Sequence, residues 1–410
     1  MERDFLEKYA DLLLQVGVNI QPGQNLVIST EPVHWDFVNM LTVRAYQLGA
    51  RYVEAQVQHP AFGKSRIDHA REEYLSYHPQ YLPGKYEEHI QEASASIRIE
   101  GSQFPDLFRD IDQDRNATVQ KTMSEVFKPF REAAGSGKIP WCVAAMPTDE
   151  WAGQVFDDTS ATADQLWELM ASILRLDADD PVATWRNLGE ALQRRADALT
   201  QSGVRHLHFE GPGTDLHIDL LEAGFWCGGP ITMADGRKFE PNLPTEEVFT
   251  SPDYRKTHGR ATVTRPVEVL GHEVDGAWFE FKDGDVVDFG AEEGRERLEK
   301  YFEIDPRARA LGEIALVDGA SPIFQSDRVF HSILYDENAA CHMALGSSYA
   351  DTYTNGANLS EDERYQLGLN QSILHTDFMI GSPEVNVTGK TPDGNRIPII
   401  ESGTFCDDFA

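Results

Sequence analysis

The first part of the chain alternates between helical and extended hydrophobic patterns. Residues 2–16 carry apolar side chains at helical spacing, and the apolar run "NLVIST" at 25–30 has the length of a buried strand. A second helical pattern at 33–50 leads into the alternating run "RYVEAQVQ" at 51–58. Repeated alternation of this kind predicts parallel strands joined by helical crossovers, and therefore an open α/β sheet.

The same cycle continues towards residue 150. The helical run "KYEEHIQEA" precedes the strand-like "SASIRIEG", and the helical stretch 116–135 precedes "WCVAAMP". Neither GxGxxG nor GxxxxGK[ST] follows any of these predicted strands. We therefore expect neither a dinucleotide site nor a P-loop.

The pattern changes after a charged helix predicted between residues 177 and 202. Beyond it "VRHLHFEG", "TDLHIDLL", "ATVTRPVEVLG" and "WFEFKDGDVVDF" read as strands, and Asp283-Gly284 signals a hairpin turn. One helix is predicted at 292–302. We predict an α/β domain with a mainly parallel open sheet over 1–190, and an α+β catalytic domain rich in antiparallel strands over 191–410.

Composition excludes several classes of partner. Acidic residues outnumber basic ones by 68 to 36, which gives a net charge of −32 and argues against nucleic acid. The four cysteines are widely spaced and form no CxxC pair, so neither a disulfide framework nor a thiolate zinc site is expected. No apolar run reaches membrane-spanning length, and the N-terminus lacks the order of a signal peptide. We expect a cytoplasmic protein without a membrane partner.

The first candidate functional residues lie in "ILHTDF" at 373–378, where His375 and Asp377 are two positions apart in an apolar run. In a strand both side chains would leave the same face and form half of a metal site. An isolated pair of this kind is more often a core histidine satisfied by its aspartate. Further ligands are therefore needed for a metal site.

His342 lies in a second apolar run, "DENAACHMALGSSY". If this run is extended, Ala344 and Gly346 share the face of His342 and leave space around its ring, and Tyr349 follows shortly. The preceding Asp336, Glu337 and Asn338 either orient ligands or form a turn with their own side-chain hydrogen bonds.

Carboxylates stand in two further apolar settings of the same half. Glu313 interrupts "ALGEIALV", and Glu246 and Glu247 stand ahead of "VFT" in "NLPTEEVFTSPD". A buried carboxylate is costly without a partner, so these residues favour a nearby cation.

These segments together resemble the M29 family of metalloaminopeptidases, the aminopeptidase T and aminopeptidase S group. The matching motifs are "NLPTEEVFTSPD", "LGEIALV", "DENAACHMALGSSY" and "HTDFMIG", in this order, and "AYQLGARYVEAQV" resembles the family's N-terminal domain. The resemblance implies two divalent ions of zinc, cobalt or manganese and a catalytic tyrosine, Tyr349. It implies that the metal ligands are Glu247, Glu313, His342, His375 and Asp377.

The function implied by the resemblance is release of N-terminal amino acids from short peptides with a free N-terminus, a hydrolase of class EC 3.4.11. The family also implies a homodimer. Glu246, beside a ligand, is a candidate general base, provided that the backbone is irregular, because adjacent residues of a strand face opposite ways. Otherwise it is an exposed acid in a proline-bounded loop.

Two other functions remain as alternatives. A mononuclear iron ring-cleaving dioxygenase resembles the same fold but keeps a smaller set of ligands, and the presence of Glu247 favours two ions and hydrolysis. A catalytically silent acidic binding protein would have lost one or more ligands. The histidines of the predicted strands at 206–217 are interpreted as structural: His206, His208 and His217.

Overall fold

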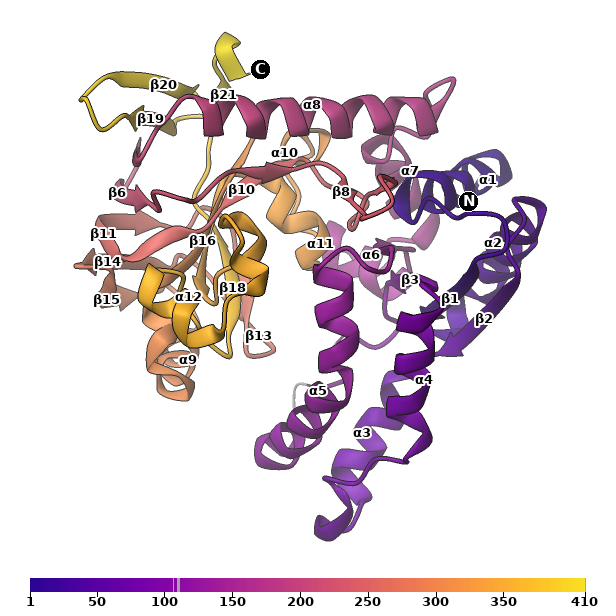
Figure 1. The fold of residues 1–410 in the computed structure, drawn as a ribbon. Coiled ribbons are helices and arrows are strands. Elements are labelled where there is room, and N and C mark those ends of the chain that lie inside the picture. The colour runs from indigo at the N-terminus through magenta and orange to yellow at the C-terminus, as the bar shows by residue number, and fades with distance from the viewer. Residues whose placement is uncertain (106, 109–110, 410) are drawn as a thin grey trace. The chain divides into compact units, whose positions relative to one another are not determined.

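The structure is a computed structural model that describes residues 1–105, 107–108 and 111–409. The chain forms two compact units (Figure 1). Unit 1 comprises Met1–Asn187 with Pro230–Pro244, and unit 2 comprises Leu188–Gly229 with Thr245–Ala410.

Unit 1 is built on a four-stranded parallel sheet, as the alternating pattern predicts. Its strand order is β2-β1-β3-β4, and the buried strands are apolar where they face the flanking helices. The strands are β1 (Asn25–Thr30), β2 (Tyr52–Val57), β3 (Ala95–Glu100) and β4 (Trp141–Ala145). The prediction of a mainly parallel open sheet is confirmed.

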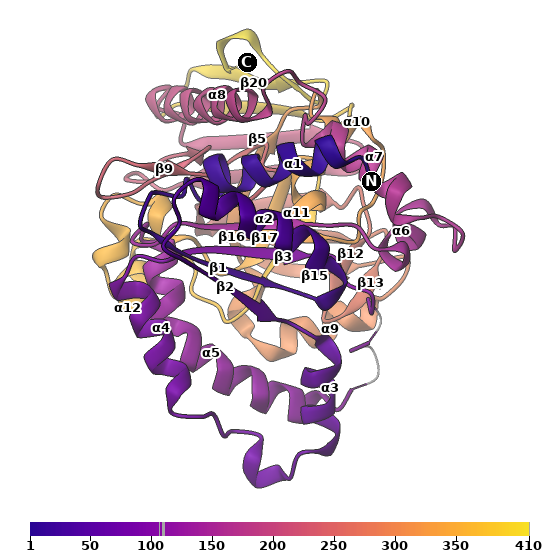
Figure 2. The same ribbon diagram turned by 90° about the vertical axis from the view of Figure 1, so that its right-hand side faces the viewer.

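Seven helices of the described residues accompany this sheet. Two of them, α1 and α2, lie against one face of the sheet, and Figure 2 looks onto them. The helices are α1 (Arg3–Leu12), α2 (Trp35–Gln47), α3 (Pro60–His69), α4 (Tyr81–Gln91), α5 (Gln113–Gly135), α6 (Asp149–Phe156) and α7 (Ala163–Ile173).

The sequence predicts a single domain boundary at residue 190, and the structure divides the chain differently. The division falls inside helix α8 (Pro181–Gln201), and the segment Pro230–Pro244 returns to unit 1. This segment carries the short hairpin β8 (Ile231–Thr232) and β9 (Lys238–Phe239). It then joins the edge of β4, because the Val143 N–H donates to the Pro241 carbonyl over 2.8 Å. No long apolar pattern in the sequence predicts that this segment contacts the edge of β4.

Unit 2 contains a five-stranded sheet in the order β18-β17-β16-β10-β7 and an eight-stranded sheet in the order β15-β14-β11-β6-β5-β19-β20-β21. All neighbouring strands in both sheets are antiparallel, which confirms the predicted class. The five-stranded sheet comprises β7 (Cys227–Gly228), β10 (Glu247–Thr250), β16 (Leu311–Val317), β17 (His342–Gly346) and β18 (His375–Met379).

The eight-stranded sheet carries the predicted β14–β15 hairpin, with Asp283 and Gly284 both at positive φ. Its strands are β5 (His206–Gly211), β6 (Thr214–Leu220), β11 (Pro252–Thr262), β14 (Trp278–Lys282), β15 (Asp285–Gly290), β19 (Asn386–Lys390), β20 (Arg396–Glu401) and β21 (Thr404–Phe405). A separate pair is β12 (Val267–Val269) and β13 (His272–Val274), and the helices are α9 (Arg295–Ile304), α10 (Pro322–Gln325), α11 (Ile333–Asp336) and α12 (Glu361–Leu367).

One apolar core joins the two sheets of unit 2. Leu207 and Leu216 enter it from the eight-stranded sheet, and Ile314 and Met343 enter it from the five-stranded sheet. Side chains alternate along a strand, so residues next to these core positions face the opposite side of each sheet. The polar side chains that alternate with these core residues therefore lie on the faces of the two sheets that point away from the core.

Among the described residues no helix combines the length and the apolar content that crossing a bilayer requires.

The buried hydroxyl of Tyr9 closes the end of β4, because it donates to the Ala145 carbonyl over 2.9 Å and accepts from the Ala145 N–H over 3.2 Å. We predict that Tyr9→Phe lowers the free energy of unfolding in urea by about 1–3 kcal/mol, since it leaves buried backbone groups unsatisfied. Tyr81→Phe, at a 74% exposed position, is the matched control. Equal stabilities of the two variants would contradict this assignment.

Candidate metal centre

The five predicted ligands lie on four neighbouring strands of the five-stranded sheet. Glu247 begins β10, Glu313 lies in β16, His342 begins β17, and β18 supplies His375 and Asp377. Glu313, His342 and Asp377 are each at most 6% exposed. Four segments that are remote in sequence thus converge on one buried place.

Strand register puts all five side chains on one face. Glu313 and Asp377 both pair with Ala344, His375 pairs with Gly346, and His342 pairs with Ala315. Directly opposed residues of antiparallel strands share a face, so the partners of these ligands point the same way. Ala315, Ala344 and Gly346 are small and leave room for the imidazoles and carboxylates beside them, while Val317 opposite Glu247 and Met379 opposite His342 bound the cluster.

The ligand atoms form two groups of three that share Glu313. His342 Nε2 lies 3.2 Å from Glu247 Oε2, and His375 Nε2 lies 3.2 Å from Glu313 Oε2 and 3.4 Å from Asp377 Oδ1. Within each group one ligand atom per residue lies within 4.8 Å of the others. The groups are Glu247, Glu313, His342 and Glu313, His375, Asp377.

Backbone carbonyls orient both imidazoles. His375 Nδ1 lies 2.8 Å from the Ser347 carbonyl, and His342 Nδ1 lies 3.2 Å from the Ala340 carbonyl. A carbonyl only accepts, so each Nδ1 carries a hydrogen and each ring turns its Nε2 towards the carboxylates, where the neutral ring would present a lone pair to a metal ion. This is the tautomer that a metal-binding histidine uses.

The charges of the five-residue ligand cluster favour the binding of cations. Glu247 Oε2 and Asp377 Oδ1 are buried, and each lies beside an imidazole Nε2, at 3.2 Å from His342 and 3.4 Å from His375 respectively. Burial raises the pKa of Glu313 to about 7, although the hydrogen bond from His375 opposes the shift. Burial lowers the pKa of His342, but the hydrogen bond and charge of Glu247 outweigh it and raise the pKa to about 10. Oxygen and nitrogen donors of this kind fit zinc, cobalt or manganese.

Tyr349 reaches the same place from the loop that follows β17. Its hydroxyl lies 3.3 Å from His375 Nε2, and its ring meets Phe249 at 5.5 Å between centroids. The ring is 41% exposed, so one side faces solvent while the hydroxyl faces the ligands. Desolvation, with the charges of Glu313 and Asp377, raises the pKa of Tyr349 well above its ordinary value. The hydroxyl therefore stays protonated and can donate.

Glu246 precedes β10, outside the regular strand, and is 6% exposed. Its backbone N–H donates to Asn338 Oδ1 over 2.6 Å, and its charge acts on Arg195. Glu246 is therefore not an exposed loop acid, and Asn338 fixes the backbone one residue ahead of Glu247. Asp336, by contrast, accepts from the N–H groups of Phe330 and Ser332 and forms a turn.

Glu337 is the acidic residue whose position the sequence did not reveal. Burial raises its pKa well above the ordinary value, and the charges of Glu247, Asp377 and Glu313 raise it further. The Glu337 carboxyl is therefore within range of the charges of the ligand cluster. The segment before His342 is short 3-10 helix rather than strand, so the alternation rule could not assign the direction of its side chains.

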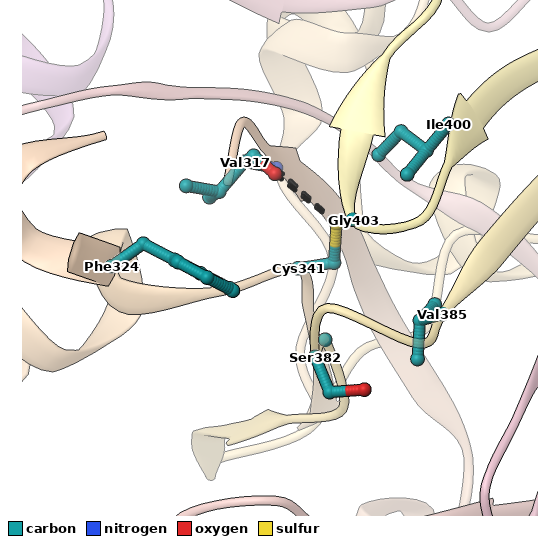
Figure 3. Close-up of a pocket in the computed structure, with 8 residues that line it drawn as sticks. Val317, Phe324, Cys341, Ser382, Val385, Ile400 and Gly403 are labelled. Carbon is teal, nitrogen blue, oxygen red and sulfur yellow. Dashed lines mark hydrogen bonds between the residues drawn. The ribbon is translucent and has the colours of Figure 1, made fainter. Parts of the chain in front are cut away.

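Cys341, although next to His342, belongs to the apolar packing. Figure 3 shows its sulfur beside Val317, with Phe324 and Ile400 around a hollow that has no room for a water molecule. The Val317 N–H donates to Cys341 Sγ over 3.4 Å, and burial raises the pKa of the thiol to about 12. A protonated core thiol of this kind is not a ligand.

Comparison with known proteins agrees with this geometry. The family model described as thermophilic metalloprotease (M29) matches residues 2–405. Aminopeptidase 2 of Geobacillus stearothermophilus is 40% identical over 407 residues, with 99% of this chain and 98% of the relative covered. Aminopeptidase T of Thermus aquaticus is 34% identical over 402 residues, with 98% of each chain covered.

A solved structure, wild-type AmpT from Thermus thermophilus, superposes with a TM-score of 0.90 at 33% identity and covers 98% of both chains. The fold and the ligand cluster thus define a metal-dependent peptidase class. The chain belongs to the M29 family of metalloproteases, which confirms the resemblance seen in its motifs.

Gly346 gives the centre a direct stability test. Its φ is +119°, and an added Cβ would lie 2.1 Å from the Leu374 carbonyl oxygen, next to His375. We predict that Gly346→Ala lowers the free energy of unfolding by about 2 kcal/mol more than Gly394→Ala, measured by urea denaturation. Gly394 also has positive φ but open space around it, so it controls for backbone strain alone. Equal losses would contradict the role assigned to close packing here.

Proposed function

We propose that the chain is an aminopeptidase that releases N-terminal amino acids from short peptides and belongs to class EC 3.4.11. The observation that carries the proposal is the pair of three-ligand groups that share Glu313. Membership of a metalloprotease family and the names of the aminopeptidase relatives support the same reaction.

We propose that two divalent ions of zinc, cobalt or manganese are held by Glu247, Glu313, His342, His375 and Asp377. Three carboxylates and two imidazoles fit two such ions, with the shared Glu313 between the groups. When bound, a pair of ions lowers the pKa of a water molecule from about 15.7 towards about 7 and polarises the scissile carbonyl.

Tyr349 is proposed to stabilise the negative oxygen that develops as the peptide carbonyl becomes tetrahedral. Its protonated hydroxyl lies at the edge of the cluster, and its partly exposed ring is accessible to a substrate. A pre-positioned donor of this kind is worth on the order of 3 kcal/mol in the transition state.

Two carboxyls, one on Glu246 and one on Glu337, are candidates for accepting the proton of the attacking water. Glu246 is the residue predicted from the sequence, and its general-base role stays a prediction. Glu337 is the second candidate, and its electrostatic interactions with Glu247, Glu313 and Asp377 favour it. A general base must lie within reach of the water, and the charges of three ligand carboxylates act on Glu337.

The iron dioxygenase alternative is not favoured, because the chain keeps Glu247 beyond the smaller ligand set and its relatives are peptidases. The homodimer and the cytoplasmic location remain proposals that rest on the family resemblance.

We predict that Glu313→Gln abolishes hydrolysis of aminoacyl anilides and lowers the bound metal from two ions to at most one, because both groups lose a shared anion. Elemental analysis and a panel of anilides measure the two effects. An exposed Glu384→Gln variant is the control.

In the same assay, wild-type enzyme treated with a chelator should lose activity and recover it with zinc, cobalt or manganese. N-acetylated anilides should not react, because the free amine is part of recognition. Near-normal turnover by Glu313→Gln, or stoichiometric iron in the active protein, would contradict the proposed reaction.

We predict that Glu337→Gln lowers kcat about 10²–10⁴-fold while the metal content stays at two ions, as loss of a general base requires. Glu246→Gln is the parallel variant and should retain most of its kcat if Glu337 accepts the proton. The reverse ranking of the two variants would assign the proton to Glu246. Loss of metal in Glu337→Gln would show instead that Glu337 is a ligand.

A further inference from the structure

A second group of histidines and carboxylates lies on the other sheet of unit 2. Along β5 the alternating Leu207 and Phe209 enter the core, so His206, His208 and Glu210 face away from it. These three residues pair in register with three of β6 in the order Asp219, His217 and Asp215. The group therefore occupies the face of the eight-stranded sheet that turns away from the core and from the predicted catalytic ligands.

Three of these residues present ligand atoms to one point. His208 Nε2 lies 2.7 Å from Asp215 Oδ1, and His217 Nε2 lies 3.5 Å from the same oxygen. One atom from each residue lies within 4.8 Å of the other two. The two rings stack with centroids 4.0 Å apart, which holds both Nε2 atoms on the same side.

The opposite nitrogen of each ring is held by a neighbour. His208 Nδ1 lies 3.3 Å from Glu210 Oε2, which can accept a hydrogen from this nitrogen. A carboxylate only accepts, so His206 Nδ1, 2.7 Å from Asp219 Oδ1, carries a hydrogen. His206 Nε2 is then an acceptor, and His217 Nδ1 donates to it over 3.1 Å.

This chain of hydrogen bonds fixes the tautomers of His206 and His217, so the neutral His217 ring directs the lone pair of Nε2 at the carboxylate of Asp215. His208 Nε2 donates to the same carboxylate over 2.7 Å in the absence of an ion. A metal ion bound at this point would take the Nε2 lone pair of His208 once its ring hydrogen is on Nδ1, the nitrogen that faces Glu210.

We propose that His208, Asp215 and His217 bind a divalent transition-metal ion of the zinc class at a second site, separate from the catalytic centre. Two imidazoles and one carboxylate are a donor set that zinc, nickel and copper favour over calcium or magnesium. Glu210 and His206 act as positioning residues, because each fixes the ring of a ligand.

The surroundings carry charges of both signs. Glu210 and Asp219 add negative charge that favours a cation, whereas the neighbouring strands contribute Lys390 beside His206, His258 beside His217 and Arg260 beside Asp215. Arg260 stacks 3.9 Å above the ring of Trp278, which occupies its guanidinium outside the cluster. A bound ion would clamp the β5–β6 hairpin, and because the ligands converge only in the folded chain it would stabilise the folded state.

The test uses untagged full-length protein freed of metal by chelation. Free Zn²⁺ is raised stepwise in equilibrium dialysis until the wild type saturates, and the bound zinc is counted by elemental analysis. The variants are Asp215→Asn and His217→Ala, and His258→Ala is the matched control on the same face. Asp215 and His217 are 76% and 40% exposed, so both variants keep the core intact.

We expect the wild type and His258→Ala to bind one zinc ion more than Asp215→Asn and His217→Ala. His206→Ala should weaken binding of that ion about 10- to 100-fold. The thermal midpoint of the wild type should rise with zinc by more than that of Asp215→Asn.

Hydrolysis of aminoacyl anilides should be equal in the wild type and Asp215→Asn, so the result is independent of the proposed peptidase reaction. Equal zinc counts in all four proteins would overturn the proposal, because they would show that His208, Asp215 and His217 bind no zinc.

Discussion

The structure of unit 2 depends on the cost of burying three carboxylates with only two imidazoles beside them. A buried carboxylate without a compensating charge is expensive, and the carboxylates of this cluster outnumber the imidazoles of His342 and His375 that lie beside them. The shifted pKa values of Glu313 and His342 express the same imbalance, since the cluster retains protons that free side chains would release. Divalent ions remove the imbalance, and this requirement explains the ligand chemistry.

The antiparallel sheet supplies the geometry that the ions need. Its register puts the small residues Ala344 and Gly346 opposite Glu313, Asp377 and His375, while the other face of the same strands packs into the core. Gly346 and Ala344 thus have a part in the site although neither carries a functional group. The backbone carbonyls of Ala340 and Ser347 orient the imidazoles of His342 and His375, so the backbone determines the direction of these two ligands.

Much of this arrangement can be predicted from the sequence. The alternation of helical and extended runs indicates the parallel sheet, and the "HTDF" motif puts His375 and Asp377 on one face because a strand repeats every two residues. Periodicity cannot bring Glu247, Glu313 and His342 to that face, because long-range register is not visible in a local pattern. Their choice comes from resemblance to a family.

Other features lie outside the reach of local patterns. Glu337 sits in a short 3-10 turn, whose side chains follow no alternation, and residues 230–244 join unit 1 through edge hydrogen bonds. The histidines on β5 and β6 share a face, as strands require, but only the pairing of His208 with His217 turns them into one cluster. Contacts between strands, and not residue types, decide these cases.

The most direct measurement is anomalous X-ray diffraction from crystals of the zinc-loaded protein, recorded on both sides of the zinc absorption edge. The account predicts two strong peaks on either side of the Glu313 carboxylate, one near His342 and one near His375. A single peak there, or none, would contradict a centre built for two ions.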